Sequence, residues 1–338
     1  MRTAVIGAGR MGRRHVQVAQ ELKHELVGVA DIKSEALAEL EKPSNFPKRI
    51  LFDNPVELLN TTHPECVVVS TTAPSHADYV CLAAELGAKY ILCEKPMAVS
   101  LAECDKMIEI CNKHGALLAV NHQMRYMEQY TAPKKIIESL DFGELASVTV
   151  IAGNFGLAMN GSHYFEMFRF MTGEKPSGIT AWFSKEPVPN PRGSEFEDRA
   201  GSVRIVTTNG IRFYLETGSD QGNGITVVYA GKYGQIVVDE LAGEMQIVLR
   251  EAKYHDLPTT RYGMPSLRSR VVINPADAVA PTRCVLEALI AKGDYPSGEI
   301  GRMTVATLAA AYISNDDGNR HVTLEEAYKT PSRIFPWA

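Results

Sequence analysis

The sequence predicts an α/β protein in which a doubly wound parallel sheet is followed by an α+β domain with a large, mostly antiparallel sheet. Over roughly the first 120 residues, short apolar runs alternate with helical patterns, which is typical of βαβ units. After about residue 143, apolar runs follow one another across short turns such as Thr208-Asn209-Gly210, which indicates an antiparallel sheet. Because 338 residues exceed one typical core, we expect two domains, residues 1–122 and 123–338.

The elements of the first domain follow from its apolar runs and helix caps. Its strands are near-continuously apolar, as expected for a sheet covered on both faces. Ser75 and Ser100 are expected N-caps, and Ser100 forms a capping box with Glu103. The predicted strands are 3–6, 25–30, 49–52, 66–70, 88–93 and 116–120, and the predicted helices are 11–22, 34–41, 75–86 and 100–114.

The second domain is expected to be a sheet interrupted by one helix, with two more helices near its end. Gly173 is the expected C′ residue of the interrupting helix. The segment 185–199 is rich in Pro, Gly and charge, and is either a lid or a long connection. The predicted strands are 148–154, 178–183, 202–207, 211–216, 225–229, 235–238 and 245–250, and the helices are 162–172, 282–292 and 302–314.

Composition narrows the class of protein. A net charge of −5 gives no electrostatic reason to expect nucleic acid or an anionic membrane as partner. No apolar stretch approaches the roughly 20 residues of a membrane span. Because MRTAVIGAGR enters a strand and a glycine turn almost at once, we expect no signal peptide. The six cysteines form no C-x-x-C pair, so we expect a reduced, cytoplasmic protein without structural zinc.

A glycine-rich turn between the first strand and the first helix predicts a Rossmann dinucleotide site. In Gly7-Ala-Gly9-Arg-Met-Gly12, the glycines allow the tight turn, the approach of a pyrophosphate and close packing of helix on strand. Asp31 ends the second strand, about 20 residues on, where an acid holds the ribose hydroxyls. A carboxylate there repels a 2′-phosphate, so NAD is favoured over NADP, although Lys33 would soften that preference.

Polar residues gather where the later strands end. Glu94-Lys95-Pro96 follows the fifth strand, Thr71-Thr72-Ala73-Pro74 the fourth, and Asn121-His122 the sixth. In a doubly wound sheet, ligands bind beyond the carboxyl ends of the strands, so these residues are expected beside the nicotinamide. The expected cofactor-binding residues are Gly7, Gly9, Arg10, Met11, Gly12, Asp31, Thr71, Thr72, Pro74, His76, Glu94, Lys95 and His122.

Taken together, these segments resemble the Gfo/Idh/MocA family of oxidoreductases. The resemblance rests on GAGRMGRRH at 7–15, Asp31, TTAPSHADYVCLAAELGAKYILCEKPMAVS at 71–100, VNHQMRY at 120–126, GSHYFEMFRFMTG at 161–173 and the late helix 301–320. It implies a Rossmann domain, a second domain with a large sheet, and NAD(P)-dependent chemistry on a sugar or cyclitol hydroxyl. It also implies homodimers or homotetramers formed through the exposed face of the second sheet.

The resemblance assigns roles to particular residues. Lys95 is implied to hydrogen-bond the reacting oxygen, with a cis Lys95–Pro96 bond and with Glu94 orienting Lys95 or lining the cofactor pocket. His163 is implied to be the catalytic base, a role that suits the pKa of histidine. Arg125 and Asn160 are the other substrate-binding candidates, although Arg125 is equally consistent with a surface salt bridge.

One position departs from the family pattern. Many members carry an aspartate four residues before the histidine, where this chain has Met159. Methionine cannot accept a proton or orient an imidazole, so the usual relay is in doubt, and Asn160 is a partial substitute. Glu166 is a conservative replacement for the family's acid three residues after the histidine. His163 and Glu166 alone do not predict a metal site.

Three functions remain open from the sequence. The first is an NAD-dependent oxidoreductase that acts on a secondary hydroxyl of a sugar, nucleotide-linked sugar or cyclitol. The second is a glycoside hydrolase that uses NAD by transient oxidation. The third is a non-catalytic NAD-binding sensor, which Met159 favours and the retention of Lys95 and His163 opposes.

Overall fold

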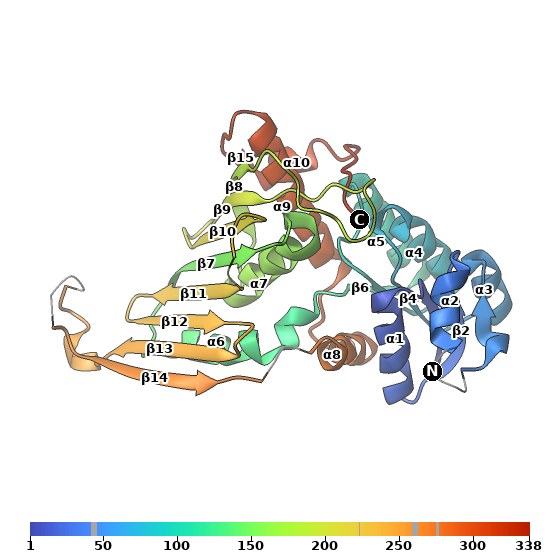
Figure 1. Ribbon diagram of the computed structural model, residues 1–338, viewed down its shortest axis with the longest axis horizontal. Coiled ribbons are helices and arrows are strands. Elements are labelled where there is room, and N and C mark those ends of the chain that lie inside the picture. Colours follow the sequence, from blue (N-terminus) through green and yellow to red (C-terminus); the bar gives the residue numbers. More distant parts are fainter. Residues whose placement is uncertain (42–45, 223, 259–262, 275–276) are drawn as a thin grey trace. The chain divides into compact units, whose positions relative to one another are not determined.

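The computed structural model describes residues 1–41, 46–222, 224–258, 263–274 and 277–338, and the chain divides into two compact units (Figure 1). Unit 1 comprises Met1–Gln123, Asp277–Val305 and Thr330–Ala338, and unit 2 comprises Met124–Ala276 and Ala306–Lys329. The sequence led us to expect a second domain continuous from residue 123, whereas two late segments return to unit 1. The first returns because helix α8 (Val279–Ile290) packs on α1 (Arg10–Glu21) and the Pro296 carbonyl accepts a hydrogen bond from Val120 N at 2.8 Å. The second returns because Phe335 N donates to the Val99 carbonyl at 2.9 Å.

Unit 1 is built on a six-stranded parallel sheet in the order β3-β2-β1-β4-β5-β6. Every residue of β4 is buried, as expected where both faces of a sheet are covered. The doubly wound parallel sheet predicted from the sequence is therefore confirmed. The strands are β1 (Arg2–Ile6), β2 (Glu25–Ala30), β3 (Leu51–Phe52), β4 (Cys66–Val69), β5 (Tyr90–Cys93) and β6 (Leu117–Val120).

The register of this sheet aligns the strand ends. Ile6 pairs with Val69, Val69 with Cys93, and Cys93 with Val120, so the last residues of β1, β4, β5 and β6 form one row. The residues that follow each strand therefore emerge at the same edge. That edge is where a doubly wound sheet binds its ligands.

The helices of unit 1 mostly match their sequence signals. Ser100 accepts a hydrogen bond from Glu103 N at 3.2 Å, as predicted for an N-cap, but the Glu103 carboxylate accepts from Val99 N at 3.2 Å. Ser75 occupies the N-cap position of α4 without capping it, since its hydroxyl donates to Thr71 Oγ1 at 2.7 Å. The other helical segments are α2 (Ser34–Glu41), η1 (Lys48–Ile50), α3 (Pro55–Thr62), η2 (Ala73–Ser75), α4 (His76–Glu85) and α5 (Leu101–His114).

Helix α3 is one that our sequence analysis did not anticipate, although its start carries a strong local signal. Asn54 occupies the N-cap position, and its side chain accepts hydrogen bonds from Val56 N at 2.9 Å and Glu57 N at 3.3 Å. Pro55 is the first helical residue, a position that suits its fixed φ and missing N–H. An Asn-Pro pair before a short apolar run was therefore sufficient to predict this helix.

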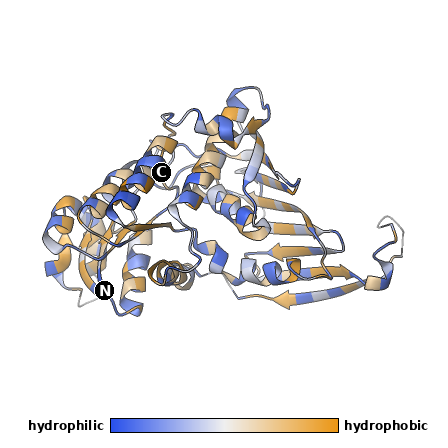
Figure 2. Cartoon of the chain, turned by 180° about the vertical axis from the view of Figure 1, so that it is seen from behind, coloured by the Kyte–Doolittle hydropathy of each residue, from blue (hydrophilic) through white to orange (hydrophobic). Residues whose placement is uncertain are grey.

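Unit 2 contains a nine-stranded sheet in the order β14-β13-β12-β11-β7-β10-β9-β8-β15. All its pairs are antiparallel except the one between β7 and β10, which confirms the large, mostly antiparallel sheet. Its strands carry both hydrophobic and hydrophilic residues, and burial alternates strictly along β9 (Figure 2). The strands are β7 (Leu145–Gly153), β8 (Pro176–Phe183), β9 (Gly201–Thr207), β10 (Arg212–Gly218), β11 (Thr226–Gly231), β12 (Gly234–Asp239), β13 (Glu244–Arg250), β14 (Ser266–Val272) and β15 (Val322–Thr323).

Several elements of unit 2 were not predicted, and for two of them, α6 (Glu128–Ile137) and β14, the reason is clear. Helix α6 carries Pro133 inside it, which normally argues against a helix. The edge strand β14 has no buried face, so it lacks the alternating pattern that marks a half-buried strand. The remaining helical segments are η3 (Gln123–Tyr126), the π-helical turn η4 (Leu157–Gly161), α7 (Ser162–Thr172), η5 (Ala252–Tyr254), α9 (Gly298–Asp316) and α10 (Leu324–Tyr328).

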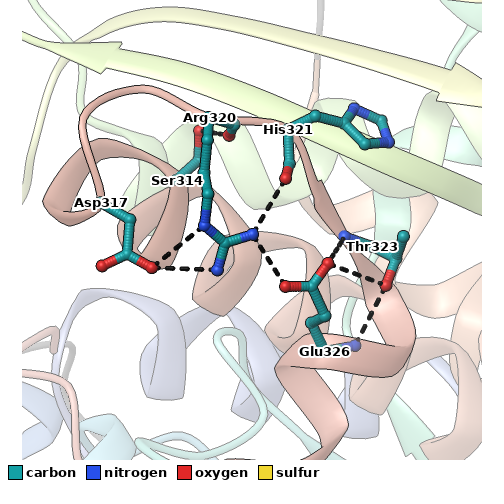
Figure 3. Close-up of polar contacts among 6 residues, drawn as sticks. All are labelled: Ser314, Asp317, Arg320, His321, Thr323 and Glu326. Carbon is teal, nitrogen blue, oxygen red and sulfur yellow. Dashed lines mark hydrogen bonds and ion pairs between the residues drawn. The ribbon is translucent and has the colours of Figure 1, made fainter.

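A polar cluster holds the connection from α9 through β15 to α10 (Figure 3). Arg320 donates to Asp317 at 2.9 Å and to Glu326 at 2.8 Å, and Thr323 and Glu326 form a reciprocal capping box. Such exposed ion pairs contribute little singly. The buried Ser314 adds a firmer tie, because its hydroxyl donates to the Arg320 carbonyl at 2.6 Å and accepts from Ala181 N at 3.0 Å.

Candidate functional site

The glycine turn after β1 has the geometry that its sequence predicts. Gly7 has φ +95°, and a Cβ there would lie 2.6 Å from the Ser70 carbonyl oxygen. A Cβ on Gly12 would lie 1.9 Å from the Gly7 carbonyl oxygen, so α1 packs against the turn only because residue 12 is glycine. Gly9 is exposed, and no described atom lies within 4 Å of a Cβ built on it. The turn therefore leaves its backbone open at Gly9.

The start of α1 offers its backbone N–H groups to a ligand. Gly9 is the N-cap residue, and no described side chain caps this helix. Arg10 is exposed and Met11 half-buried in the first turn. Uncapped N–H groups and the helix dipole favour a negatively charged group. An open glycine before an uncapped helix fits the pyrophosphate of a dinucleotide.

Asp31 lies immediately after β2 and holds the glycine turn. Its Oδ2 accepts a hydrogen bond from Ala8 N at 2.7 Å, and its Oδ1 accepts from Lys33 N at 2.8 Å. The side chain is half-buried, so part of the carboxylate faces solvent. Each carboxylate oxygen has a further lone pair, and these suit the hydroxyls of a ribose. Asp31 therefore serves the turn and remains able to bind the cofactor.

The end of β4 provides Thr71 and Thr72, both half-buried, and the exposed Pro74. His76 was predicted to bind the cofactor, but both of its ring nitrogens face backbone carbonyls. Nδ1 lies 3.1 Å from the Pro96 oxygen and Nε2 lies 3.3 Å from the Thr71 oxygen. Burial lowers the pKa of His76, which favours a neutral ring. His76 thus ties α4 to the turn after β5.

The Glu94-Lys95-Pro96 turn is buried throughout. The Lys95–Pro96 peptide bond is cis, as the resemblance implied. Glu94 is 3% exposed and Lys95 is 8% exposed. Because charged groups are rarely buried unless paired, the surroundings of these two side chains decide what the turn does.

The Glu94 carboxylate is held by three elements of unit 1. Its Oε1 accepts from His15 Nε2 and from Asn121 Nδ2, both at 2.8 Å, and its Oε2 accepts from Lys95 N at 3.3 Å. Burial by itself would raise the pKa of Glu94, but the His15 hydrogen bond and the His15 and Lys95 charges outweigh it and lower the pKa. Glu94 is therefore an ionised anchor that joins α1, β5 and β6, and it accepts from the Lys95 backbone.

Sequence reasoning missed two of these partners. His15 lies inside the motif GAGRMGRRH, and Asn121 directly follows β6, so both carried a positional signal. Thr282 of α8 adds a further hydrogen bond to this series, because its Oγ1 accepts from Asn121 Nδ2 at 3.3 Å. No local pattern marks Thr282, since it lies 161 residues from Asn121.

His122 ends the row of strand ends and is buried. Its Nε2 lies 3.3 Å from Thr304 Oγ1, and the Thr304 hydroxyl donates to the Gly301 carbonyl at 2.7 Å. This contact ties His122 to the Thr304 hydroxyl of α9. His122 remains a candidate at the sheet edge.

In unit 2, His163 lies in the first turn of α7 and is buried. Glu166 Oε1 accepts from Arg169 Nη2 at 2.9 Å and lies 4.0 Å from Arg125 Nε. Arg125 is buried over the Phe170 ring, at 4.7 Å from its centroid. The alternative of a surface salt bridge for Arg125 is therefore wrong, because its guanidinium lies inside the unit. Asn160 is half-buried in η4.

A buried acid anchors α7 to the sheet of unit 2. Glu240 accepts hydrogen bonds from the Tyr130 hydroxyl at 2.5 Å and the Tyr164 hydroxyl at 3.0 Å. Burial raises the pKa of Glu240 to about 7. Since Tyr164 is the neighbour of His163, this contact fixes the part of α7 that carries the histidine.

Two further observations concern the residues that the structure describes. In that part of the chain, no group of three or more His, Cys, Asp or Glu side chains is arranged to hold a metal ion. Among the described helices, none combines the length and the apolarity that crossing a membrane requires.

Comparison with known proteins finds a family model that matches the first 122 residues. Residues 1–122 match the Gfo/Idh/MocA model, described as an oxidoreductase family with an NAD-binding Rossmann fold. The chain is 24% identical over 196 residues to the myo-inositol 2-dehydrogenase of Thermotoga maritima, covering 54% of this chain and 58% of that one. It is 32% identical over 143 residues to the inositol 2-dehydrogenase of Serratia proteamaculans, covering 41% and 42% respectively. The chain thus spans about half the length of the curated relatives it matches.

A solved structure shares the fold over nearly the whole chain. An oxidoreductase from Agrobacterium radiobacter, solved with NAD⁺, L-tartaric acid and magnesium, superposes with a TM-score of 0.79 at 17% identity and covers 96% of this chain and 98% of its own. At that identity the likeness establishes the fold alone. With the glycine turn, Asp31 and the row of strand ends in place, residues 1–122 have a Rossmann fold and are similar to the NAD-binding domain that the Gfo/Idh/MocA oxidoreductase model describes.

Proposed function

We propose that this protein is an NAD-dependent oxidoreductase that acts on a secondary hydroxyl of a sugar, nucleotide-linked sugar or cyclitol. One observation carries the proposal: the buried Lys95 follows β5 at the sheet edge that also bears the glycine turn after β1. An ammonium group at the edge where the dinucleotide binds suits a substrate oxygen that gains negative charge. The inositol 2-dehydrogenases among the relatives support this substrate class.

The residues of this chain handle the oxygen and its proton. NAD, when bound, accepts the hydride from carbon. Lys95 is proposed to hydrogen-bond the substrate oxygen and to stabilise alkoxide character, and His163 is proposed to take the hydroxyl proton. The Glu94 carboxylate accepts a hydrogen bond from the Lys95 backbone N–H, and the His76 ring contacts the Pro96 carbonyl of the cis turn. Arg125 and Asn160 are proposed substrate-binding residues of unit 2.

A substrate panel tests the function. Purified protein is mixed with NAD or NADP and members of a panel of polyols, sugars and nucleotide-linked sugars, and NADH or NADPH formation is followed by absorbance. We expect reduction of NAD with at least one cyclitol or sugar. Glycoside cleavage without net NADH would favour the hydrolase alternative. Dinucleotide binding without any turnover across the panel would contradict the proposed function.

Asp31 is proposed to set the preference for NAD over NADP. Asp31→Asn keeps an oxygen that accepts from Ala8 N but removes the charge that repels a 2′-phosphate. We expect the ratio of NAD to NADP affinity to fall at least about tenfold, or 1.4 kcal/mol. Titration of each cofactor measures the ratio, and Glu21→Gln at the far end of α1 is the matched control. An unchanged ratio in Asp31→Asn would assign the preference elsewhere.

We also propose a homodimer or homotetramer formed through the outer face of the nine-stranded sheet. Large apolar side chains stand exposed there on β7, β8 and β10, namely Ile151, Trp182 and Tyr214. Exposed apolar groups on a sheet face favour association. Light scattering of the purified chain measures the mass of the assembly.

A cytoplasmic location is also proposed, and it is supported by the six cysteines, all of which are free thiols.

A further inference from the structure

Met159 lies at the start of the helical segment that carries His163, where many family members have an aspartate. In the structure, a carboxylate from the C-terminal end of the 185–199 segment lies at this start. Asp198 accepts a hydrogen bond from Ala158 N at 2.8 Å and from Met159 N at 3.1 Å. Its side chain is 1% exposed. A buried carboxylate that accepts two backbone N–H bonds is stabilised in its ionised form.

The surrounding backbone is built to admit this carboxylate. A Cβ on Gly156 would lie 2.1 Å from Asp198 Cγ, so residue 156 must be glycine for the two segments to meet. Leu157 N donates to the Arg199 carbonyl at 2.7 Å, and Val188 N donates to the Asp198 carbonyl at 2.9 Å. The end of the 185–199 segment is therefore a docked connection that runs along the start of η4.

The docked carboxylate lies at the helical end that carries His163. Turn η4 and helix α7 follow without a break, and His163 lies four positions after Met159. The positive end of a helix dipole disfavours a protonated imidazole in its first turns, and a carboxylate at that end offsets the effect. The other charged or titratable groups around the cap are Glu197 and Arg199 on the same segment and Tyr312 on α9. Glu166 and Arg169 lie further along α7, and Arg125 of η3 lies beside Glu166.

We propose that Asp198 is a positioning residue for His163, and that the 185–199 segment delivers from elsewhere in the chain the carboxylate that residue 159 lacks. Asp198 fixes the start of the helix and supplies negative charge there. The catalytic consequence rests on the proposed function, since it requires that His163 take the substrate proton. The effect of Asp198 on the helix end that carries His163 does not depend on the proposed function.

The test compares D198N with wild type and with E197Q. Glu197 lies beside Asp198 but pairs with Arg199 at the surface, so E197Q makes the same change of charge without touching the cap. We expect D198N to lower kcat by about tenfold to a hundredfold with little change in KM for NAD, because a small displacement of a catalytic group is costly. We expect E197Q to behave as wild type.

A second readout needs no turnover. The protein is labelled isotopically at histidine for NMR. The signal of the His163 imidazole is assigned by its loss in H163N, and its chemical shift is then followed as a function of pH. We expect D198N to lower the pKa of His163 by about half a unit or more, because the charge that favours imidazolium is removed. If D198N does not fold, as judged by circular dichroism, D198S provides the same loss of charge in a smaller side chain.

The outcomes separate the two proposals. A His163 titration that is unchanged in D198N, or changed equally in E197Q, would overturn the role of Asp198. A changed titration in a protein that oxidises no member of the substrate panel would support the role of Asp198 while contradicting the proposed function. Recovery of kcat in M159D/D198N, which carries a carboxylate within the helix itself, would give further support. Loss of kcat in D198N with an unchanged His163 signal would count against the inference.

Discussion

Replacement of Lys95 by methionine is expected to lower kcat/KM for the best substrate of the panel by about a hundredfold to a thousandfold. Loss of a donor aimed at developing oxyanion charge has an effect of that size. Methionine preserves most of the buried stem of Lys95 and removes the ammonium group. NAD affinity is expected to change little, because the glycine turn follows β1 and Asp31 follows β2, whereas Lys95 follows β5. Steady-state kinetics and titration with NAD measure the two quantities.

The matched control for this variant lies at the other end of the same strand. Lys89 precedes β5 and is exposed, so Lys89→Met removes an equal charge far from the strand end. We expect its kinetics to match those of wild type. Full activity in Lys95→Met would refute the proposed role of Lys95, whereas loss of NAD binding together with activity would assign the lysine to the cofactor instead.

Replacement of His15 by leucine is expected to destabilise unit 1 by about 3 kcal/mol or more. The variant leaves the buried Glu94 carboxylate without the hydrogen bond that His15 Nε2 donates at 2.8 Å. Removing one partner of a buried charged pair is costly because the other charge stays buried and uncompensated. Glu94→Gln/His15→Leu is expected to lose less than the sum of the two single variants, since the residues share one interaction.

The two tryptophans allow the measurement to be confined to unit 1. Trp337 is fully buried and donates to the Ala98 carbonyl at 2.9 Å, close to the turn after β5, whereas Trp182 belongs to unit 2. In a Trp182→Phe background, fluorescence during urea unfolding therefore reports unit 1. Equal midpoints for wild type and His15→Leu in that background would contradict the prediction.

The pH dependence of this effect has a definite sign. The pKa of Glu94 is lower in the folded protein than its usual value of 4.5, so the unfolded chain binds more protons in acid. The stability that Glu94 contributes is present above pH 4.5 and is lost as the pH falls through the folded pKa. In His15→Leu, burial is no longer opposed by His15, so this contribution shrinks. The stability difference between wild type and variant is therefore expected to be larger at pH 7.5 than in acid.

The sequence by itself determined the features that depend on short-range physics. The steric demands of Gly7 and Gly12, the acid after the second strand and the periodicity of the apolar runs sufficed for the parallel sheet and the cofactor turn. Strand 25–30 and helix 162–172 even appear with their predicted bounds. These signals work because a turn, a cap or a strand is stabilised mainly by residues that are close in the chain.

Only the tertiary structure decided which distant residues meet. His15 reaches Glu94 across 79 positions, and Asp198 reaches Ala158 across 40. The return of Asp277–Val305 to unit 1 and the burial of Arg125 are of the same kind. No local pattern encodes such contacts, because they arise when burial forces each polar group to find a partner wherever the fold supplies one. The charged turn after β5 was therefore readable from the sequence, while the pairing of Glu94 with His15 and Asn121 was not.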